Sequence, residues 1–197
     1  MSTAGRAAPR AETRTLVAGI GNVFLGDDGF GVEAVRRLRQ SPPPRGVEYL
    51  DVGIRGLDLA YRLLDGYRRL ILVDALARGA EPGTVCVLDA GAEMTALRCP
   101  PALDGHGLDP ATVLRLVRGL SETIGGTPPQ QIFVVGCEPL DVSEGMGLTP
   151  PVAKALPAAL DAVTGLLGDG QQSTARRRPL DREDGAGAPV IQKGKRG

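Results

Sequence analysis

The sequence predicts a three-layer α/β/α sandwich around a five-stranded, mostly parallel sheet with one antiparallel strand. Short apolar runs alternate with amphipathic stretches along the chain, which is typical of β-α units. The chain has 197 residues and 42% hydrophobic residues, enough for one domain with a substantial core. Two apolar runs are joined by a connection too short for a crossover helix, which predicts an antiparallel or edge strand.

Five apolar segments have the length and composition of strands, and several are continuous apolar runs of the kind buried in parallel sheets. They are Thr15–Gly19, Val47–Val52, Arg69–Ala75, Thr84–Leu88 and Gln131–Gly136. The turn sequence Glu81-Pro82-Gly83 leads directly into the fourth segment. We therefore expect the fourth strand to run antiparallel to the others or to lie at an edge.

Four stretches between the strands place apolar residues at helical spacing. They cover Gly29–Gln40, Leu57–Leu64, a segment that begins at Pro110, and a segment from Pro150 to about Leu167. The last two are preceded by Asp109 and Thr149, so each combines a capping residue with proline at the first helical position. We expect Pro157 to bend the last helix. Right-handed crossovers place helices on both faces of the sheet.

The central body, residues 15–168, is flanked by two segments that are poor in apolar residues. We expect residues 1–14 to form a disordered lead and residues 169–197 a disordered basic tail, because neither buries enough surface to offset its ordering entropy. The whole chain has 23 basic and 23 acidic residues, but the body alone has 13 basic and 18 acidic residues. The body is therefore mildly acidic and the ends are basic.

Composition excludes several classes of partner. Aromatic residues are only 3% and the net charge is zero, so we expect no nucleic-acid binding. No apolar run approaches the ~20 residues of a membrane helix, and the first residues are polar, so we expect neither a membrane span nor a secretory signal. Cys86, Cys99 and Cys137 are widely spaced, which indicates free thiols in a reducing cytoplasm. We expect a cytoplasmic monomer.

The densest motif is GIGNVFLGDDGFG, residues Gly19–Gly31, directly after the first strand. Five glycines in thirteen residues indicate close backbone approach or unusual dihedral angles. A dinucleotide fingerprint would fit the first two glycines, but its third position is Phe24, which should block the close approach of a helix. Asp27 and Asp28 would repel a pyrophosphate at the helix start. Helix capping is the alternative role for these two acids.

Two further residues are candidates for chemistry. Asp74 ends the third strand, and His106, the only histidine, lies in a glycine-rich loop before the third helix. Considered one at a time, Asp74 is typical of a turn-forming aspartate and His106 of a solvated loop histidine. If the first and third strands are neighbours at the topological switch point, Asp28 and Asp74 share one crevice, with His106 above it. Two carboxylates and an imidazole suit a divalent metal with open positions.

The motifs GIGNVFLGDDGFG, LILVDA, GHGLDPATVL, VVGCEP and GLTP occur in this order, and their combination resembles the hydrogenase maturation protease family over roughly Thr15–Leu167. The resemblance implies an endopeptidase that removes a short C-terminal peptide from the nickel–iron hydrogenase large-subunit precursor after nickel insertion. It implies that Asp28, Asp74 and His106 are the catalytic, metal-binding residues. It further implies that the nickel is supplied by the substrate and acts as a recognition element.

One segment departs from the family pattern. Several relatives carry Asp-Gly-Gly-Thr after the second strand, in a loop linked to substrate recognition, whereas this chain has the segment DVGIR at residues 51–55. Asp51 and Gly53 match the aspartate and one glycine of the family pattern. We expect Asp51, Gly53 and Asn22 to contact the substrate.

The resulting mechanistic hypothesis is metal-gated peptide hydrolysis. The attacking water is activated by the metal or deprotonated by a nearby carboxylate such as Asp27, and both routes stay open. A covalent route is not expected, because the sole histidine belongs to the metal trio and no nucleophile has another. Two alternatives remain: a nickel-dependent docking or chaperone protein that binds the precursor without cleaving it, and a nucleotide-binding α/β protein.

Overall fold

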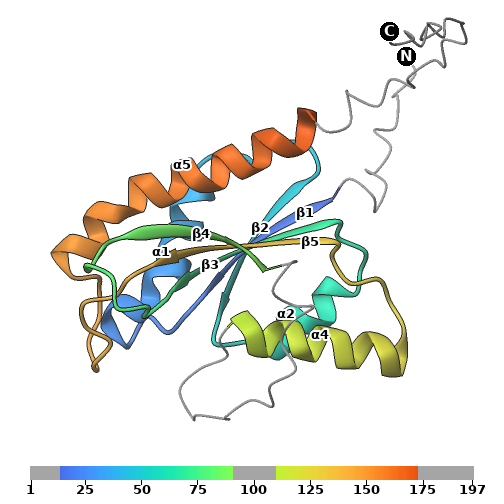
Figure 1. The fold of residues 1–197 in the computed structure, drawn as a ribbon, viewed down its shortest axis with the longest axis horizontal. Helices are drawn as coiled ribbons and strands as arrows, with labels where there is room; N and C mark the ends of the chain where they lie inside the picture. The colour runs from blue at the N-terminus through green and yellow to red at the C-terminus, as the bar shows by residue number, and fades with distance from the viewer. Residues whose placement is uncertain (1–13, 91–109, 173–197) are drawn as a thin grey trace, which may run out of the picture.

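The computed structural model describes residues 14–90 and 110–172 (Figure 1). The elements are β1 (Thr15–Ile20), the 3-10 turn η2 (Gly26–Gly29), α1 (Phe30–Leu38), β2 (Val47–Gly53), α2 (Gly56–Leu63), β3 (Arg69–Ala75), β4 (Val85–Asp89), α4 (Pro110–Ile124), β5 (Gln131–Cys137) and α5 (Pro150–Gln172). All predicted strands and helices are present within a few residues of their expected bounds. Residues 1–13 of the predicted lead, most of the tail, Cys99, His106 and Asp109 lie outside the described residues.

The sheet has the strand order β2-β1-β3-β5-β4. β2, β1, β3 and β5 are parallel to one another, and β4 pairs antiparallel with β5 at the edge. The connection from β3 to β4 is limited to residues 76–84, which cannot form a crossover helix, so the chain must reverse. The predicted antiparallel edge strand is confirmed.

Helices cover both faces of the sheet, as predicted: α1 and α5 lie on one face, and α2 and α4 lie on the other (Figure 1). Alternate side chains of each strand point to opposite faces. In β1, Leu16 and Ala18 therefore pack in the core under α2 and α4, whereas Val17 packs under α1 and α5. Two separate cores result, one on each side of the sheet.

The topology reverses between β1 and β3. The chain leaves β1 toward β2 on one side and returns across β1 to form β3 on its other side. The first and third strands are thus neighbours, as predicted. Their carboxyl ends lie on the left of Figure 1, where the loops after β1 and β5 also lie. Ligands of open α/β sheets bind at such a switch point.

Helix α5 runs to Gln172, five residues beyond the predicted end near Leu167, and Pro157 lies inside it. The described cysteines, Cys86 and Cys137, are free, as predicted. Within the part of the chain that the structure describes, no helix is both long and apolar enough to cross a bilayer.

Candidate functional site

Helix α1 lies directly against the carboxyl ends of β1 and β3, and Gly31 permits this approach. A Cβ atom at Gly31 would lie 2.0 Å from the carbonyl oxygen of Val73 and 2.4 Å from that of Ile20. Only a residue without a side chain fits there. The close approach brings η2, which precedes α1, into contact with β3.

The expectation that Phe24 blocks the close approach of a helix is wrong. Phe24 lies in the loop between β1 and η2 with 63% of its surface exposed, and α1 begins only at Phe30. The glycine that lets the helix approach the sheet is Gly31, seven residues later. Phe24 therefore does not exclude a nucleotide, whereas Asp27 and Asp28 at the start of the helix would still repel a pyrophosphate.

Asp27 is fully buried, and its carboxylate accepts four hydrogen bonds. The donors are the backbone N–H groups of Leu140 (2.9 Å), Asp141 (3.0 Å) and Thr149 (2.6 Å), and the Thr149 hydroxyl (2.8 Å). Burial alone would raise the pKa of Asp27, but these hydrogen bonds outweigh burial and lower the pKa below its ordinary value.

These contacts correct both roles considered for Asp27. It is not the proton acceptor for an attacking water, because its oxygens are occupied and its lowered pKa makes it a weaker base. It is not a helix cap either, since neither η2 nor α1 has a side-chain cap hydrogen bond. Asp27 joins the glycine block to the loop between β5 and α5.

Asp28 has a different environment, although it is the next residue. It is partly exposed, and one oxygen of its carboxylate accepts the backbone N–H of Asn22 at 2.6 Å. Gly21 makes this turn possible, because it has a φ of +125° and a Cβ there would lie 1.8 Å from the Asp28 carbonyl oxygen. A carboxylate has about four lone-pair positions, so Asp28 retains capacity for a ligand.

Asp74 is the penultimate residue of β3 and is only 6% exposed. It follows Val73, which packs under α1 and α5, so strand alternation directs Asp74 to the α2 and α4 face. Its Oδ1 accepts the backbone N–H of Ala75 at 2.9 Å. Because η2 contacts β3, Asp28 and Asp74 lie on adjoining segments at the switch point.

The third member of the expected trio, His106, lies outside the described residues. Within residues 14–90 and 110–172, no three histidine, cysteine, aspartate or glutamate side chains form a group that could hold a metal ion. The structure thus places two of the three predicted ligands at the same edge of the sheet. The complete metal site stays a prediction.

The three expected substrate-binding residues lie at the same carboxyl edge. Asp51 and Gly53 end β2, which is paired with β1, and the Gly53 carbonyl accepts the N–H of Gly21 at 3.1 Å. The Asp51 carboxylate lies 3.4 Å from Arg36. The side chain of Asn22 accepts the N–H of Phe24 at 3.0 Å, which stabilises the loop. Their contact with substrate stays a prediction.

Glu138 is a buried acid that was not among the residues predicted from the sequence. It follows β5 as Asp74 ends β3, so an acid after a buried strand is the signal that could have found it. Its carboxylate accepts the N–H groups of Arg78 (2.8 Å) and Gly79 (3.1 Å), and these bonds lower the pKa of Glu138. Glu138 therefore holds the connection between β3 and β4.

The neighbouring thiol is a poor nucleophile. Burial, with smaller contributions from Asp27, Cys86 and Glu138, raises the pKa of Cys137 to about 11. The thiolate form is therefore scarce at neutral pH, which agrees with the expectation of a non-covalent route.

Comparison with known proteins identifies similar chains. The model of a family described as hydrogenase maturation protease (HycI) matches residues 32–166, which include Asp74 and His106 and begin after Asp28. The hydrogenase expression/formation protein HupD of Rhizobium leguminosarum bv. viciae is 34% identical over 93% of this chain and 86% of HupD. The coenzyme F420 hydrogenase subunit delta of Methanothermobacter thermautotrophicus is 31% identical over 80% of this chain and 96% of that protein.

The fold is shared with a solved structure, the hydrogenase maturating endopeptidase HybD from E. coli. The two chains are 32% identical and superpose with a TM-score of 0.64, covering 79% of this chain and 93% of HybD. The agreement includes the five-stranded, mostly parallel sheet with its antiparallel strand, which confirms the predicted fold class.

Proposed function

Because this chain belongs to the hydrogenase maturation protease family, we propose that it removes the C-terminal peptide of a nickel–iron hydrogenase large-subunit precursor after nickel insertion. The family supports the endopeptidase role. The substrate, the position of cleavage and the use of nickel for recognition are our proposals for this chain.

The observation that carries the proposal is the position of two carboxylates at the switch point. Asp28 follows β1 and Asp74 ends β3, and these strands are adjacent and parallel. His106 precedes α4 by four residues, and α4 runs opposite to β5, so α4 begins toward the same carboxyl edge (Figure 1). Asp28, Asp74 and the start of α4 lie toward the same edge of the sheet, which favours binding of one metal ion by Asp28, Asp74 and His106.

The donor set fits the nickel of the substrate. Carboxylate oxygens and an imidazole nitrogen are suitable ligands for nickel, and three protein ligands leave positions for groups of the precursor. A divalent metal polarises a carbonyl group or lowers the pKa of a water molecule. Since Asp27 is occupied by four hydrogen bonds, the metal is the favoured activator of the attacking water.

The test uses three separate variants, Asp28→Ala, Asp74→Ala and His106→Ala. Each is expected to fold and to leave the nickel-loaded precursor uncleaved, because each removes one ligand of the metal. Mass spectrometry of the large subunit reports loss of the C-terminal peptide, and circular dichroism reports folding. Wild-type protein with precursor that lacks nickel is expected to give no cleavage.

Asp58→Ala is the matched control, because Asp58 is an exposed aspartate on α2 that pairs only loosely with Arg55 at 3.8 Å. It is expected to cleave at the wild-type rate. Near-normal cleavage by all three site variants would contradict the assignment of the site. Equal cleavage of the precursor with and without nickel would contradict only the proposed recognition of nickel and not the protease activity.

A second candidate function has one observation in its favour. A relative at 31% identity is named as a subunit of coenzyme F420 hydrogenase, not as a protease. This name suits a protein that binds a hydrogenase component without cleaving it. An intact precursor mass together with formation of a stable complex would favour this docking role over proteolysis.

A further inference from the structure

The loop between β5 and α5 displays apolar side chains to solvent. Its residues 140–147 are all exposed, and they include Leu140, Val142 and Met146, the last with 79% of its surface accessible. Phe24, from the glycine block, is also exposed. We call these four residues the apolar platform. Clustered exposed apolar side chains are a feature of protein-binding surfaces.

The backbone of the apolar platform is anchored despite its exposure. The N–H of Gly145 donates to the carbonyl of Phe24 at 2.9 Å, and the N–H of Gly26 donates to the carbonyl of Gly145 at 2.9 Å. The buried carboxylate of Asp27 holds the N–H groups of Leu140 and Asp141. An anchored surface loses little conformational entropy when it binds a partner.

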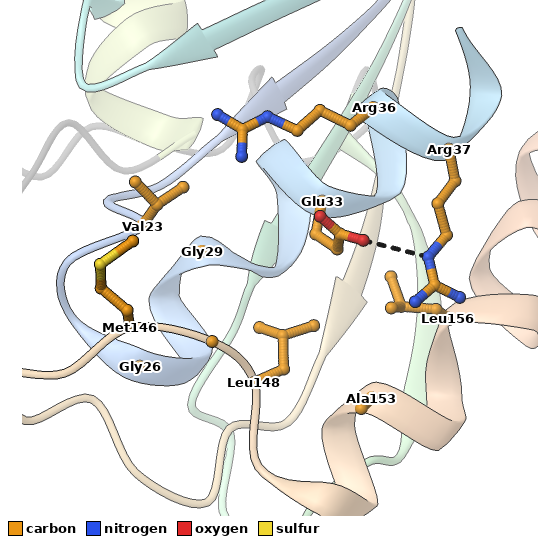
Figure 2. A pocket seen from close by; sticks show the side chains of 11 residues that line it. Val23, Gly26, Gly29, Glu33, Arg36, Arg37, Met146, Leu148, Ala153 and Leu156 are labelled. Atoms are coloured by element: carbon orange, nitrogen blue, oxygen red, sulfur yellow. Dashed lines mark hydrogen bonds and ion pairs between the residues drawn. The ribbon is translucent and has the colours of Figure 1, made fainter. Parts of the chain in front are cut away.

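A groove of about 450 Å³ lies beside the apolar platform, between α1 and the start of α5. Figure 2 shows the side chains of Val23 and Met146 next to each other at one end, with Leu148 between them and α5. Gly26 and Gly29 also line the groove. These two glycines flank Asp27 and Asp28, so the groove begins beside the candidate site.

The rim of the groove is basic. Arg36 and Arg37 extend from α1, and Glu33 is the acid that lines the groove between them (Figure 2). Arg37 pairs with Glu33 at 3.2 Å, and Arg36 pairs with Asp51 at 3.4 Å. The side chains of Arg36 and Arg37 are 55% and 40% exposed, and exposed ion pairs contribute little, so an incoming carboxylate can compete for their donors.

We propose that the apolar platform and the groove form a docking site for the precursor, separate from the metal-binding site. The site takes a surface segment of the precursor in which an apolar side chain lies next to a carboxylate. The apolar side chain contacts Met146 and Val23, and the carboxylate contacts Arg37. This inference rests on the proposed function, because it takes the precursor as the partner.

The position of the groove favours the precursor over a second copy of this chain as the occupant. Gly26 and Gly29 line the groove and flank Asp28 in the chain, so a protein bound at Asp28 lies next to the groove. Binding remote from the scissile bond lowers KM without changing the chemical step.

The experiment compares two double variants in cleavage of nickel-loaded precursor. Met146→Ser with Arg37→Gln alters the groove. Ile124→Ser with Arg118→Gln is the matched control on α4, where Ile124 is 60% exposed and Arg118 pairs with Glu122 at 3.4 Å. The groove variant is expected to raise KM about tenfold with kcat within about twofold of wild type. The control is expected to leave both constants unchanged.

The remaining outcomes separate this inference from the proposed function. If the groove variant cleaves the precursor with the kcat and KM of wild type, or if only its kcat falls, the proposed docking site is wrong. The proposed function is unaffected by either result. If wild-type protein does not cleave the precursor, the function fails, and interferometry of precursor binding tests the docking site alone. If the wild-type protein sediments as a dimer without precursor and the groove variant sediments as a monomer, the occupant is a second copy of this chain. That result would overturn the inference.

Discussion

Asp27 and Asp28 are adjacent residues of the same type, and their hydrogen-bond partners give them different chemistry. The carboxylate of Asp27 is saturated by donors from Leu140, Asp141 and Thr149. The carboxylate of Asp28 accepts one backbone N–H, from Asn22, and stays partly exposed. Asp27 therefore positions a loop, whereas the carboxylate of Asp28 keeps free lone pairs, as its predicted role as a ligand requires.

The residue-scale prediction concerns Asp27→Asn. Replacing the carboxylate by an amide puts an N–H donor where a backbone or hydroxyl donor now points, so at least one buried donor loses its acceptor. We expect the free energy of unfolding at pH 7 to fall by about 3 kcal/mol. Thr149→Val removes only the hydroxyl donor and should cost about 1 kcal/mol. Urea denaturation measures both.

The amide is nearly isosteric with the carboxylate, so the comparison isolates hydrogen bonding from packing. An Asp27→Asn protein within about 0.5 kcal/mol of wild type would show that the four hydrogen bonds do not hold this loop.

At the scale of elements, α1 determines where the candidate site lies. Its first turn rests on the carbonyl groups of Ile20 and Val73, so η2 with Asp28 is brought against the end of β3. Helices α1 and α5 then bury the same face of the sheet, with Phe30, Val35 and Leu156 in one core. Any shift of α1 away from the sheet would separate Asp28 from Asp74.

The element-scale prediction compares two Gly→Ala variants. In Gly31→Ala the new Cβ would lie 2.0 Å from the Val73 oxygen, which is backbone, so α1 must move. We expect a loss of about 3 kcal/mol or more in unfolding free energy, together with loss of cleavage. In Gly165→Ala, on α5, no atom lies within 4 Å of the new Cβ. Better helix propensity should then increase stability by up to about 1 kcal/mol.

Thermal denaturation of the two variants beside wild type gives the result directly. Equal stability of Gly31→Ala and Gly165→Ala would mean that α1 does not approach the sheet as closely as described.

At the scale of the whole molecule, several carboxylates are ionised more readily in the folded state. In Glu48, burial would raise the pKa, but the hydrogen bond from Tyr67 and the charges of Arg62 and Arg14 lower it. The pKa of Asp141 is lowered by the backbone N–H of Ser143. Asp27 and Glu138 show the same direction of shift. These groups tie together loops at both ends of the sheet.

The molecule-scale prediction is acid lability. A lowered folded-state pKa means that the ionised form stabilises the fold, so the contribution is complete above the unfolded-state pKa of about 4. It is lost as pH falls from about 4 through the lower folded-state values. We expect the melting temperature to change little between pH 8 and pH 6 and to fall steeply below about pH 4. Thermal melts across this range measure it.

Asp27→Asn should show a shallower acid dependence than wild type, because it lacks one of the titrating groups. The same melting temperature at pH 3 and pH 7 in the wild-type protein would contradict the stabilising role of these carboxylates.

The strands and helices could be predicted because their signals are local. A buried parallel strand such as Arg69–Ala75 is a continuous apolar run, and its bounds in β3 are those expected. The position of Asp74 at the end of a strand could also be predicted from the sequence. The prediction at Phe24 was wrong because it assumed the glycine spacing of a dinucleotide fingerprint, whereas the chain first forms the 3-10 turn Gly26–Gly29 and the close approach is made at Gly31.

The role of Asp27 could not be predicted, since its partners Leu140 and Thr149 are 113 and 122 residues away in the chain. Such contacts leave no periodic signal. Local signals therefore did not reveal that Asp27 is buried and hydrogen-bonded while Asp28 is partly exposed.

The order of elements, the family and the three candidate ligands were determined by the sequence alone, because periodicity and motifs are properties of neighbouring residues. The tertiary structure decided which acid is buried, where α1 meets the sheet, and that the loop after β5 is anchored to the glycine block. These features depend on hydrogen bonds and close contacts between distant segments, which exist only once the chain has folded.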